Sequence, residues 1–109
     1  MAYSEDLASR VRGLLKGRYE LVEKKMFGGL CFMINGHMFC GIINDRLVVR
    51  VGKAAYEDAL SKPGVKPMDF TGRPLSGFVY VEPKGYSTEH SLLAWISKGF
   101  KCASTLPPK

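Results

Sequence analysis

Two cysteines and two methionines around Asn35-Gly36 are the side chains best suited to redox or soft-metal chemistry. Asn-Gly between two apolar runs predicts a two-residue β-turn, because a type I′ turn needs positive φ at both central residues. Such a hairpin sets Cys31 opposite Cys40. Met33 and Met38 pair beside them, which fits either a redox pair or a Cu(I) site. Packing is the favoured interpretation, since cysteine and methionine are common core fillers and no neighbouring group activates a thiol.

The same hairpin sets two aromatic residues, Phe32 and Phe39, opposite each other on its other face. Arg46 and Arg50 follow on the next expected strand, and His37 lies beside the turn. Aromatic rings with basic neighbours are typical of a base-stacking platform for nucleic acid. Aromatic residues and arginine are equally enriched where proteins contact each other. Nucleic-acid binding and protein binding both stay open for this face.

Two consecutive glycines, Gly28 and Gly29, precede the hairpin and suggest a phosphate loop or a small-ligand pocket that also involves Arg50. A phosphate loop leads into a helix and supplies a lysine, whereas these glycines lead into an expected strand. We therefore expect a bulge or a close backbone approach at the glycines. The ligand pocket is the least favoured functional hypothesis.

The two histidines, His37 and His90, are too far apart in sequence to form a zinc pair. No serine or cysteine stands beside a base, and the carboxylates are scattered. We therefore expect no catalytic residue, no metal site and no cofactor, and hence a protein that is not an enzyme.

Helical signals occur at both ends of the chain. Ser4 can cap a first helix that stops at Gly17, and Thr88 or Ser87 can cap the last one. A short helix over residues 54–60 ends at Pro63-Gly64. The apolar stripes at helical spacing are Leu7, Val11, Leu14 and Leu15 in the first helix, and Leu92, Leu93, Ile96 and Phe100 in the last.

Strand signals fill the middle of the chain, with Asn44-Asp45 as a second two-residue turn. They predict an α+β fold in which two layers pack together: an antiparallel sheet, made of a meander and two further strands, and about three helices. We expect one domain over residues 1–109, with 105–109 as an extended tail. The expected strands are residues 20–25, 30–34, 37–43, 46–51, 67–70 and 77–81, with a turn at 71–74.

Alternation along the strands predicts which side chains share a face of the sheet. The face expected under the helices holds Cys31, Met33, Met38, Cys40, Ile42, Leu47, Val49 and Val51. The opposite face is apolar in the middle with basic groups around it, and holds Leu30, Phe32, Ile34, His37, Phe39, Ile43, Arg46, Val48 and Arg50. A slip of one residue at the second turn would change which residues of the strand after it join each face.

Composition fits a soluble globular protein, with 109 residues, 46% of them hydrophobic and 24% charged. Sixteen Lys and Arg against ten Asp and Glu give a net charge of +6, which weakly favours nucleic acid or acidic surfaces as partners. Three widely spaced cysteines suit a reducing compartment. Residues 1–16 do not form a signal peptide, so we expect the protein in the cytoplasm, away from any membrane.

Six segments together, in this order, resemble the TfoX N-terminal domain, a family named for a bacterial regulator of natural competence. The resemblance runs from about Ser4 to the end of the chain. The segments are Lys25-Met26-Phe27-Gly28-Gly29, the Asn-Gly hairpin ending in Phe39, Leu47-Val48-Val49-Arg50-Val51-Gly52, Asp69-Phe70-Thr71-Gly72-Arg73, Gly77-Phe78-Val79-Tyr80-Val81-Glu82-Pro83 and the helix around Trp95.

The resemblance implies a bacterial cytoplasmic protein without catalytic activity that regulates transcription by contacting proteins. Full-length regulators of this family carry a second, C-terminal domain, so we expect a stand-alone N-terminal domain here. Its partner is expected to be a second copy or the transcription machinery, with nucleic acid as the alternative. The expected interaction surface consists of Lys25, Met26, Phe27, Gly28, Gly29, Phe32, Phe39, Arg46, Arg50, Gly72 and Arg73.

Overall fold

A computed structural model describes residues 3–15, 22–26, 29–34, 36–68 and 77–106. Within these ranges the chain forms three α-helices, six strands and one 3₁₀ turn, η1. In chain order they are α1 (Glu5–Leu15), β1 (Val22–Met26), β2 (Gly29–Ile34), β3 (His37–Ile43), β4 (Arg46–Arg50), α2 (Tyr56–Leu60), β5 (Val65–Pro67), β6 (Phe78–Val81), η1 (Pro83–Gly85) and α3 (Glu89–Ser104).

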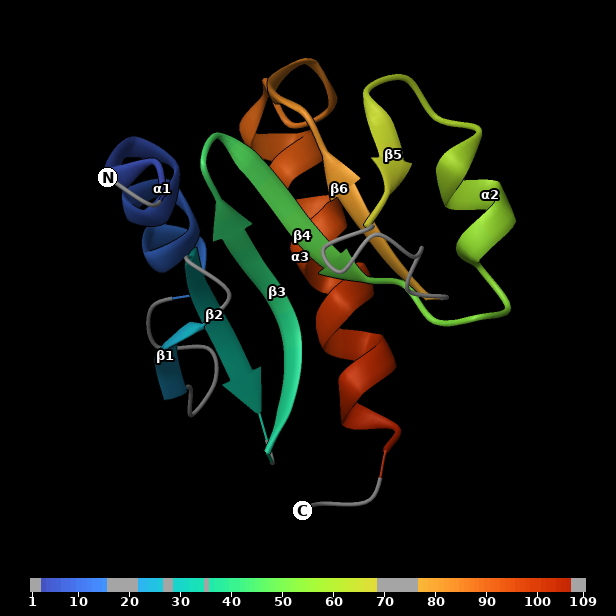
Figure 1. Cartoon of the computed structure of the whole chain (residues 1–109), viewed down its shortest axis with the longest axis horizontal. Coiled ribbons are helices and arrows are strands. Elements are labelled where there is room, and N and C mark those ends of the chain that lie inside the picture. The colour runs from blue at the N-terminus through green and yellow to red at the C-terminus, as the bar shows by residue number, and fades with distance from the viewer. Residues whose placement is uncertain (1–2, 16–21, 27–28, 35, 69–76, 107–109) are drawn as a thin grey trace.

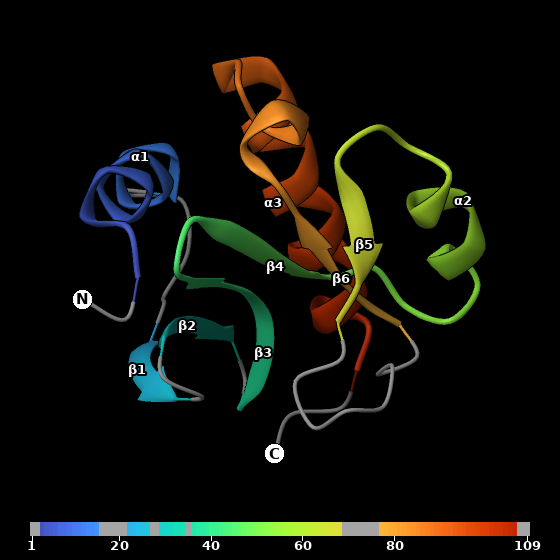
Figure 2. The same ribbon diagram turned by 45° about the horizontal axis from the view of Figure 1, so that its top comes forward.

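The strands form one antiparallel sheet in the order β1-β2-β3-β4-β6-β5. Side chains from α1, α2 and α3 share one core with the same face of this sheet, which we call the inner face. Figures 1 and 2 show α3 running behind the central strands, with α1 and α2 on either side of it. This arrangement confirms the predicted α+β fold, although the fifth strand lies at Val65–Pro67 rather than at residues 67–70. The turn expected at 71–74 lies outside the described residues.

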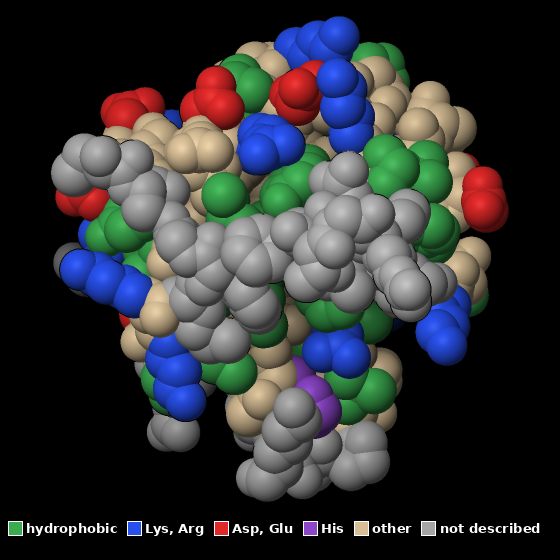
Figure 3. All heavy atoms as spheres, in the orientation of Figure 1, with side chains coloured by type: hydrophobic (Ala, Val, Ile, Leu, Met, Phe, Trp, Pro, Cys, Tyr) green, Lys and Arg blue, Asp and Glu red, His purple; other side chains and the backbone are tan. Residues whose placement is uncertain are grey.

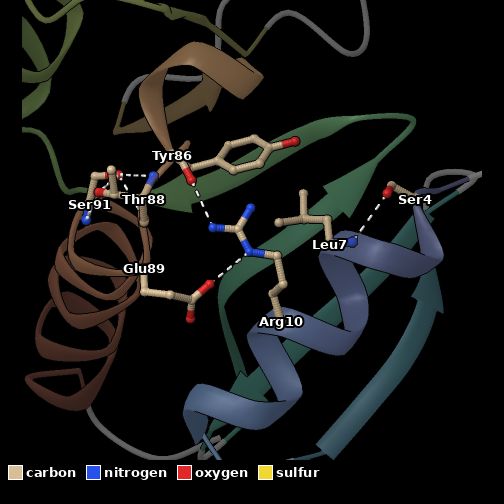
Figure 4. Close-up of polar contacts among 7 residues, drawn as sticks. All are labelled: Ser4, Leu7, Arg10, Tyr86, Thr88, Glu89 and Ser91. Atoms are coloured by element: carbon tan, nitrogen blue, oxygen red, sulfur yellow. Dashed lines mark hydrogen bonds and ion pairs between the residues drawn. The ribbon is translucent and has the colours of Figure 1, made fainter.

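Both predicted helix caps are present, and each follows from its local sequence. The backbone N–H of Leu7 donates to Ser4 Oγ at 3.2 Å. Thr88 caps α3, with its hydroxyl accepting from the N–H of Ser91 at 3.0 Å. A cap of this kind satisfies a backbone donor that the first turn of a helix leaves unpaired. Both contacts are drawn in Figure 4. The buried stripe of α3 is Leu92, Trp95, Ile96, Gly99 and Ala103.

A β-bulge at Phe39 changes the register that the Asn-Gly turn predicts. Beyond the pair Met33 and Met38, the next residue of β2, Phe32, pairs with Cys40 rather than with Phe39. Two residues of β3 therefore oppose one residue of β2. Phe39 and Cys40 both belong to the inner core and have no exposed surface.

The bulge reverses the predicted orientation of β2, because a one-residue shift exchanges the faces of a strand. Leu30 and Phe32 lie in the inner core, where Cys31 and Met33 were expected. The second turn keeps its predicted register, since Ile43 pairs with Arg46. The face assignment is therefore wrong for β2, for Phe39, and for Met38, which packs against the opposite face. It is confirmed for five inner residues, Cys40, Ile42, Leu47, Val49 and Val51, and for two residues of the opposite face, Ile43 and Val48.

Helix α3 crosses β3 at the bulge, where the two backbones come into direct contact. A Cβ atom at Gly99 would overlap the carbonyl oxygen of Phe39. Next to this contact, the rings of Phe39 and Phe100 meet edge to face, with centroids 5.8 Å apart and planes at 89°. Such aromatic pairs stabilise a core beyond the area that they bury. The absence of a side chain at Gly99 thus determines how close α3 lies to the sheet.

We expect Gly99→Ala to lower the free energy of unfolding by about 2–3 kcal/mol, because the new methyl group meets backbone that cannot rotate away. Gly13→Ala is the matched control in α1, where an added Cβ meets nothing within 4 Å. It should stabilise the protein by about 0.5–1 kcal/mol through helix propensity. Urea denaturation of both variants measures the difference. Equal effects of the two substitutions would show that the contact at Gly99 is unimportant.

Arg10 connects α1 to the segment that leads into α3, as Figure 4 shows. Its Nε donates to Glu89 Oε1 at 2.9 Å, and its Nη2 donates to the carbonyl of Tyr86 at 3.2 Å. Its guanidinium also lies over the ring of Tyr86, 5.7 Å from the centroid. The hydroxyl of Tyr86 in turn donates to the carbonyl of Asp45, at 2.6 Å, in the β3–β4 turn. One arginine and one tyrosine thus connect α1, α3 and the sheet.

Arg10→Ala is expected to lower the free energy of unfolding by about 1–2 kcal/mol, since three contacts are lost and the Tyr86 carbonyl loses a donor. Arg12→Ala, which removes a two-point ion pair with Glu23 in which the arginine is 45% exposed, against 25% for Arg10, should cost about 0.5 kcal/mol. Thermal and urea denaturation of the two variants provide the comparison. An Arg12 variant as unstable as the Arg10 variant would contradict this assignment.

Candidate functional site

The predicted glycine motif is partly described, and its described part forms the paired strands β1 and β2. Lys25 is exposed on β1 and pairs with Leu30. Gly29 is buried, and a Cβ there would overlap the carbonyl oxygen of Ile42. The expected close backbone approach is therefore confirmed at Gly29. The backbone of Met26 pairs with Gly29. Four further members of the expected surface, Phe27, Gly28, Gly72 and Arg73, lie outside the described residues.

The prediction of a base-stacking platform is wrong, because both of its aromatic rings lie in the core. Phe32 is 1% exposed and Phe39 is fully buried, as a consequence of the bulge that turns Phe32 inward. Arg46 and Arg50 do lie on the opposite, outer face. They contact other aromatic rings there, with Arg46 Cζ 4.1 Å from the ring centroid of Tyr80 and Arg50 Cζ 5.2 Å from that of Phe78.

The outer face has a small apolar cluster of its own. Its buried members are Ile43, Val48, Met68 and Tyr80, and Met38 and Phe78 pack against them. Figure 3 views the molecule from this side and shows Lys and Arg side chains at several separate places around the described surface, with Asp and Glu beside those at the top. The basic residues of this face therefore do not gather into one patch.

The structure does not bring together Gly29 and Arg50, two of the residues of the expected small-ligand pocket. Gly29 lies beside Ile42 and Ile43, near the end of β3 that pairs with the start of β4. Arg46, the first residue of β4, pairs with Ile43. Arg50 is the last residue of that strand, about 13 Å from Arg46. It lines a hollow of about 200 Å³ that Gly29 does not border. Gly29 and Arg50 therefore do not converge on one site, and Gly28 lies outside the described residues.

Two larger hollows lie on either side of Lys98, between α3 and the segments at the two ends of α2; together we call them the α2–α3 groove. One has a volume of about 460 Å³ and the other about 500 Å³. The first is lined by Val51, Gly52, Lys53, Ala54, Ala55, Lys98, Lys101, Cys102 and Thr105. The second is lined by Lys62, Pro63, Lys84, Gly85, His90, Ser91, Ala94, Trp95 and Lys98.

The lining of the α2–α3 groove is positively charged. It contains five lysines and a histidine, and neither of its described linings includes an aspartate or a glutamate. Lys62 lies 3.9 Å from Asp58, in an exposed pair that contributes little. The other four lysines, Lys53, Lys84, Lys98 and Lys101, form no ion pair with a carboxylate in the described ranges. Like charges held together in a concave surface attract anions.

Helical spacing along α3 and two tertiary hydrogen bonds bring together the residues that line the α2–α3 groove. His90, Ala94, Lys98, Lys101 and Thr105 follow one another at intervals of three or four along α3, so they share one side of that helix. Trp95 Nε1 donates to the carbonyl of Gly85 at 3.1 Å, which holds η1 against α3. The N–H of Glu82 donates to the carbonyl of Gly64 at 2.7 Å, which brings the end of α2 to the same place.

A model of the TfoX N-terminal domain family matches residues 13–103, most of the chain. The chain belongs to the TfoX N-terminal domain family. The match includes every lysine of the α2–α3 groove. A search of curated proteins found no match.

Among the residues described, no three His, Cys, Asp or Glu side chains are placed to hold a metal ion. Within the same ranges, none of the helices combines the length and the apolar character needed to cross a membrane.

The predicted pairing of Cys31 with Cys40 is wrong for the same reason as the aromatic platform. The bulge sets Cys31 opposite Gly41, and both thiols are free and buried. Burial raises the pKa of the Cys31 thiol above its usual value of 9.0. Burial raises the pKa of Cys40 further, and the nearby Cys31 adds to the shift. Both thiols are therefore protonated and unreactive at neutral pH.

We expect one thiol per domain to react rapidly with a thiol reagent at pH 7.5 and two to react only after unfolding. The fast one is Cys102, which is half-buried and lines the α2–α3 groove. Cys31 and Cys40 should react at least roughly a hundredfold more slowly, because the core must open first. Colorimetric titration in buffer and in urea gives the counts, and Cys102→Ser should remove the fast phase. Rapid reaction of two thiols would contradict the burial of Cys31 and Cys40.

Proposed function

We propose that this protein is a non-enzymatic regulatory domain that acts by binding a protein partner through the α2–α3 groove. Membership of the TfoX N-terminal domain family supports a role in regulating transcription, and we place that role in the cytoplasm. The observation that carries the proposal is the charge of the groove, where five lysines line a concave surface without a carboxylate in its described lining.

The dimensions of the groove favour a macromolecule over a metabolite. Its lining on α3 extends from His90 to Thr105, which at 1.5 Å per residue is about 22 Å. Its positive charges are distributed along this length and do not converge on a point. A small ligand is usually enclosed by a pocket that buries most of its surface. A long, open and charged groove suits an extended segment of another protein.

The chemistry of the two buried thiols supports binding over catalysis. A nucleophilic cysteine needs a lowered pKa, which a nearby cation or a helix N-terminus supplies. Cys31 and Cys40 have the opposite environment, because burial raises the pKa of each.

Self-association is a less favoured form of the same function. β1 is the end strand of the described sheet, so one of its edges is not paired within that sheet. Lys24 and Lys25 are exposed on this strand. Lysines on an edge strand oppose pairing with a second copy. We therefore place the partner at the groove rather than at the β1 edge.

The proposal predicts that partner capture depends on the groove lysines. The wild-type protein and the double variant Lys98→Gln/Lys101→Gln are immobilised in parallel and exposed to extract of the native host. A matched variant, Lys24→Gln/Lys25→Gln, removes the same charge on β1. We expect at least one protein, identified by mass spectrometry, to be retained by the wild type and the β1 variant and reduced at least roughly fivefold on the groove variant.

Three equal retention profiles would reject the groove as the working surface. If only the β1 variant failed to retain the same protein, the interaction would lie at β1, where Lys24 and Lys25 are exposed. Circular dichroism and thermal midpoints of both variants should match those of the wild type, because all four lysines are on the surface.

A further inference from the structure

We infer that the α2–α3 groove takes an acidic segment of the partner in which carboxylates are interspersed with apolar side chains. This inference rests on the proposed function and specifies the chemistry of the partner. It combines three features of the groove: the sign of its charge, the character of its apolar surface and its concave shape.

The charge requires a partner segment with several carboxylates. Lys53 and Lys62 flank α2, whereas Lys98 and Lys101 lie on α3, so the cations stand on both walls of the groove. Outside the groove, Glu89 forms an ion pair with Arg10 and Glu23 forms one with Arg12. The positive charges of the groove have no such compensation in the described structure beyond the exposed Asp58. Carboxylates on both sides of a bound segment would supply it.

The apolar surface between the lysines favours a segment that also carries hydrophobic side chains. Val51, Ala54 and Ala55 belong to one hollow, and Pro63 and Ala94 belong to the other. Most of these are small residues, which leave room for a larger side chain from a partner. Each Leu or Phe that such a segment buried there would gain the free energy of removing apolar area from water. A partner segment with only acidic side chains would leave this apolar surface exposed to water.

Shape and aromatic content disfavour nucleic acid as the occupant. A protein reads duplex DNA by inserting a convex element into the major groove, whereas this site is concave. Single strands are bound by stacking bases on exposed aromatic rings. The one aromatic side chain in the described lining is Trp95, which is 5% exposed and uses its Nε1 on Gly85. The cations of the lining are lysines, which lack the planar fork with which arginine grips phosphate.

A length of about 22 Å accommodates six or seven extended residues. The probe is therefore a fluorescein-labelled synthetic peptide of 12 residues in which Glu and Asp alternate with Leu and Phe. Its control replaces every carboxylate by the corresponding amide. A labelled single-stranded oligonucleotide of 12 nucleotides is the competing probe. Fluorescence anisotropy measures binding to the full chain at low and moderate salt.

The acidic peptide should bind at least roughly tenfold more tightly than its amide control and more tightly than the oligonucleotide. Lys98→Gln/Lys101→Gln should weaken the binding of this peptide roughly fivefold to tenfold, and Lys24→Gln/Lys25→Gln less than twofold. Raising the salt concentration should weaken it further, since exposed charges are screened.

Equal binding of the acidic and amide peptides would overturn the inference, as would tighter binding of the oligonucleotide or equal losses in the two double variants. Failure here is distinct from failure of the proposed function. A protein captured from extract through Lys98 and Lys101, together with a peptide that does not bind, would overturn the acidic segment and leave the groove as the partner site. Absence of any groove-dependent protein would overturn the proposed function itself.

Discussion

The contact between Gly99 and the carbonyl of Phe39 is the constraint on which the rest of the structure depends. A side chain at residue 99 would push α3 away from the sheet and separate the rings of Phe39 and Phe100. The bulge at Phe39 is the other half of this contact, because it directs two successive residues of β3 into the inner core. The position of α3 then decides where Trp95, Lys98 and Lys101 lie, and hence where the groove forms.

Local signals predicted most of the elements. The caps at Ser4 and Thr88 and the turns at residues 35–36 and 44–45 depend on neighbours in sequence, and both caps and the second turn appear where expected. The bulge could not be predicted in this way. Nothing in His37–Ile43 marks Phe39 as the extra residue, and the glycine against which its carbonyl packs is 60 positions away. One such event reversed the predicted faces of β2.

The candidate site was missed for a related reason. Sequence pattern emphasised aromatic and sulfur-containing residues, whose chemistry is recognisable from type alone, and the fold buries most of them in the core. The lysines of the groove come from three separate regions, each with one or two charges that look like an ordinary solvated surface. The spacing of His90, Lys98 and Lys101 shows that they share one side of α3. That Lys53, Lys62 and Lys84 face them is a property of the tertiary structure.

Trp95 gives the groove an optical property of its own. It is the single tryptophan of the chain, and it lines the half of the groove that also contains His90. The emission of an indole depends on its hydrogen bond and on the polarity around it, and here that bond runs to the carbonyl of Gly85. The intrinsic fluorescence of the protein therefore comes mainly from one ring in the wall of its proposed binding site. The protein carries its own spectroscopic reporter at the place where a partner would displace water.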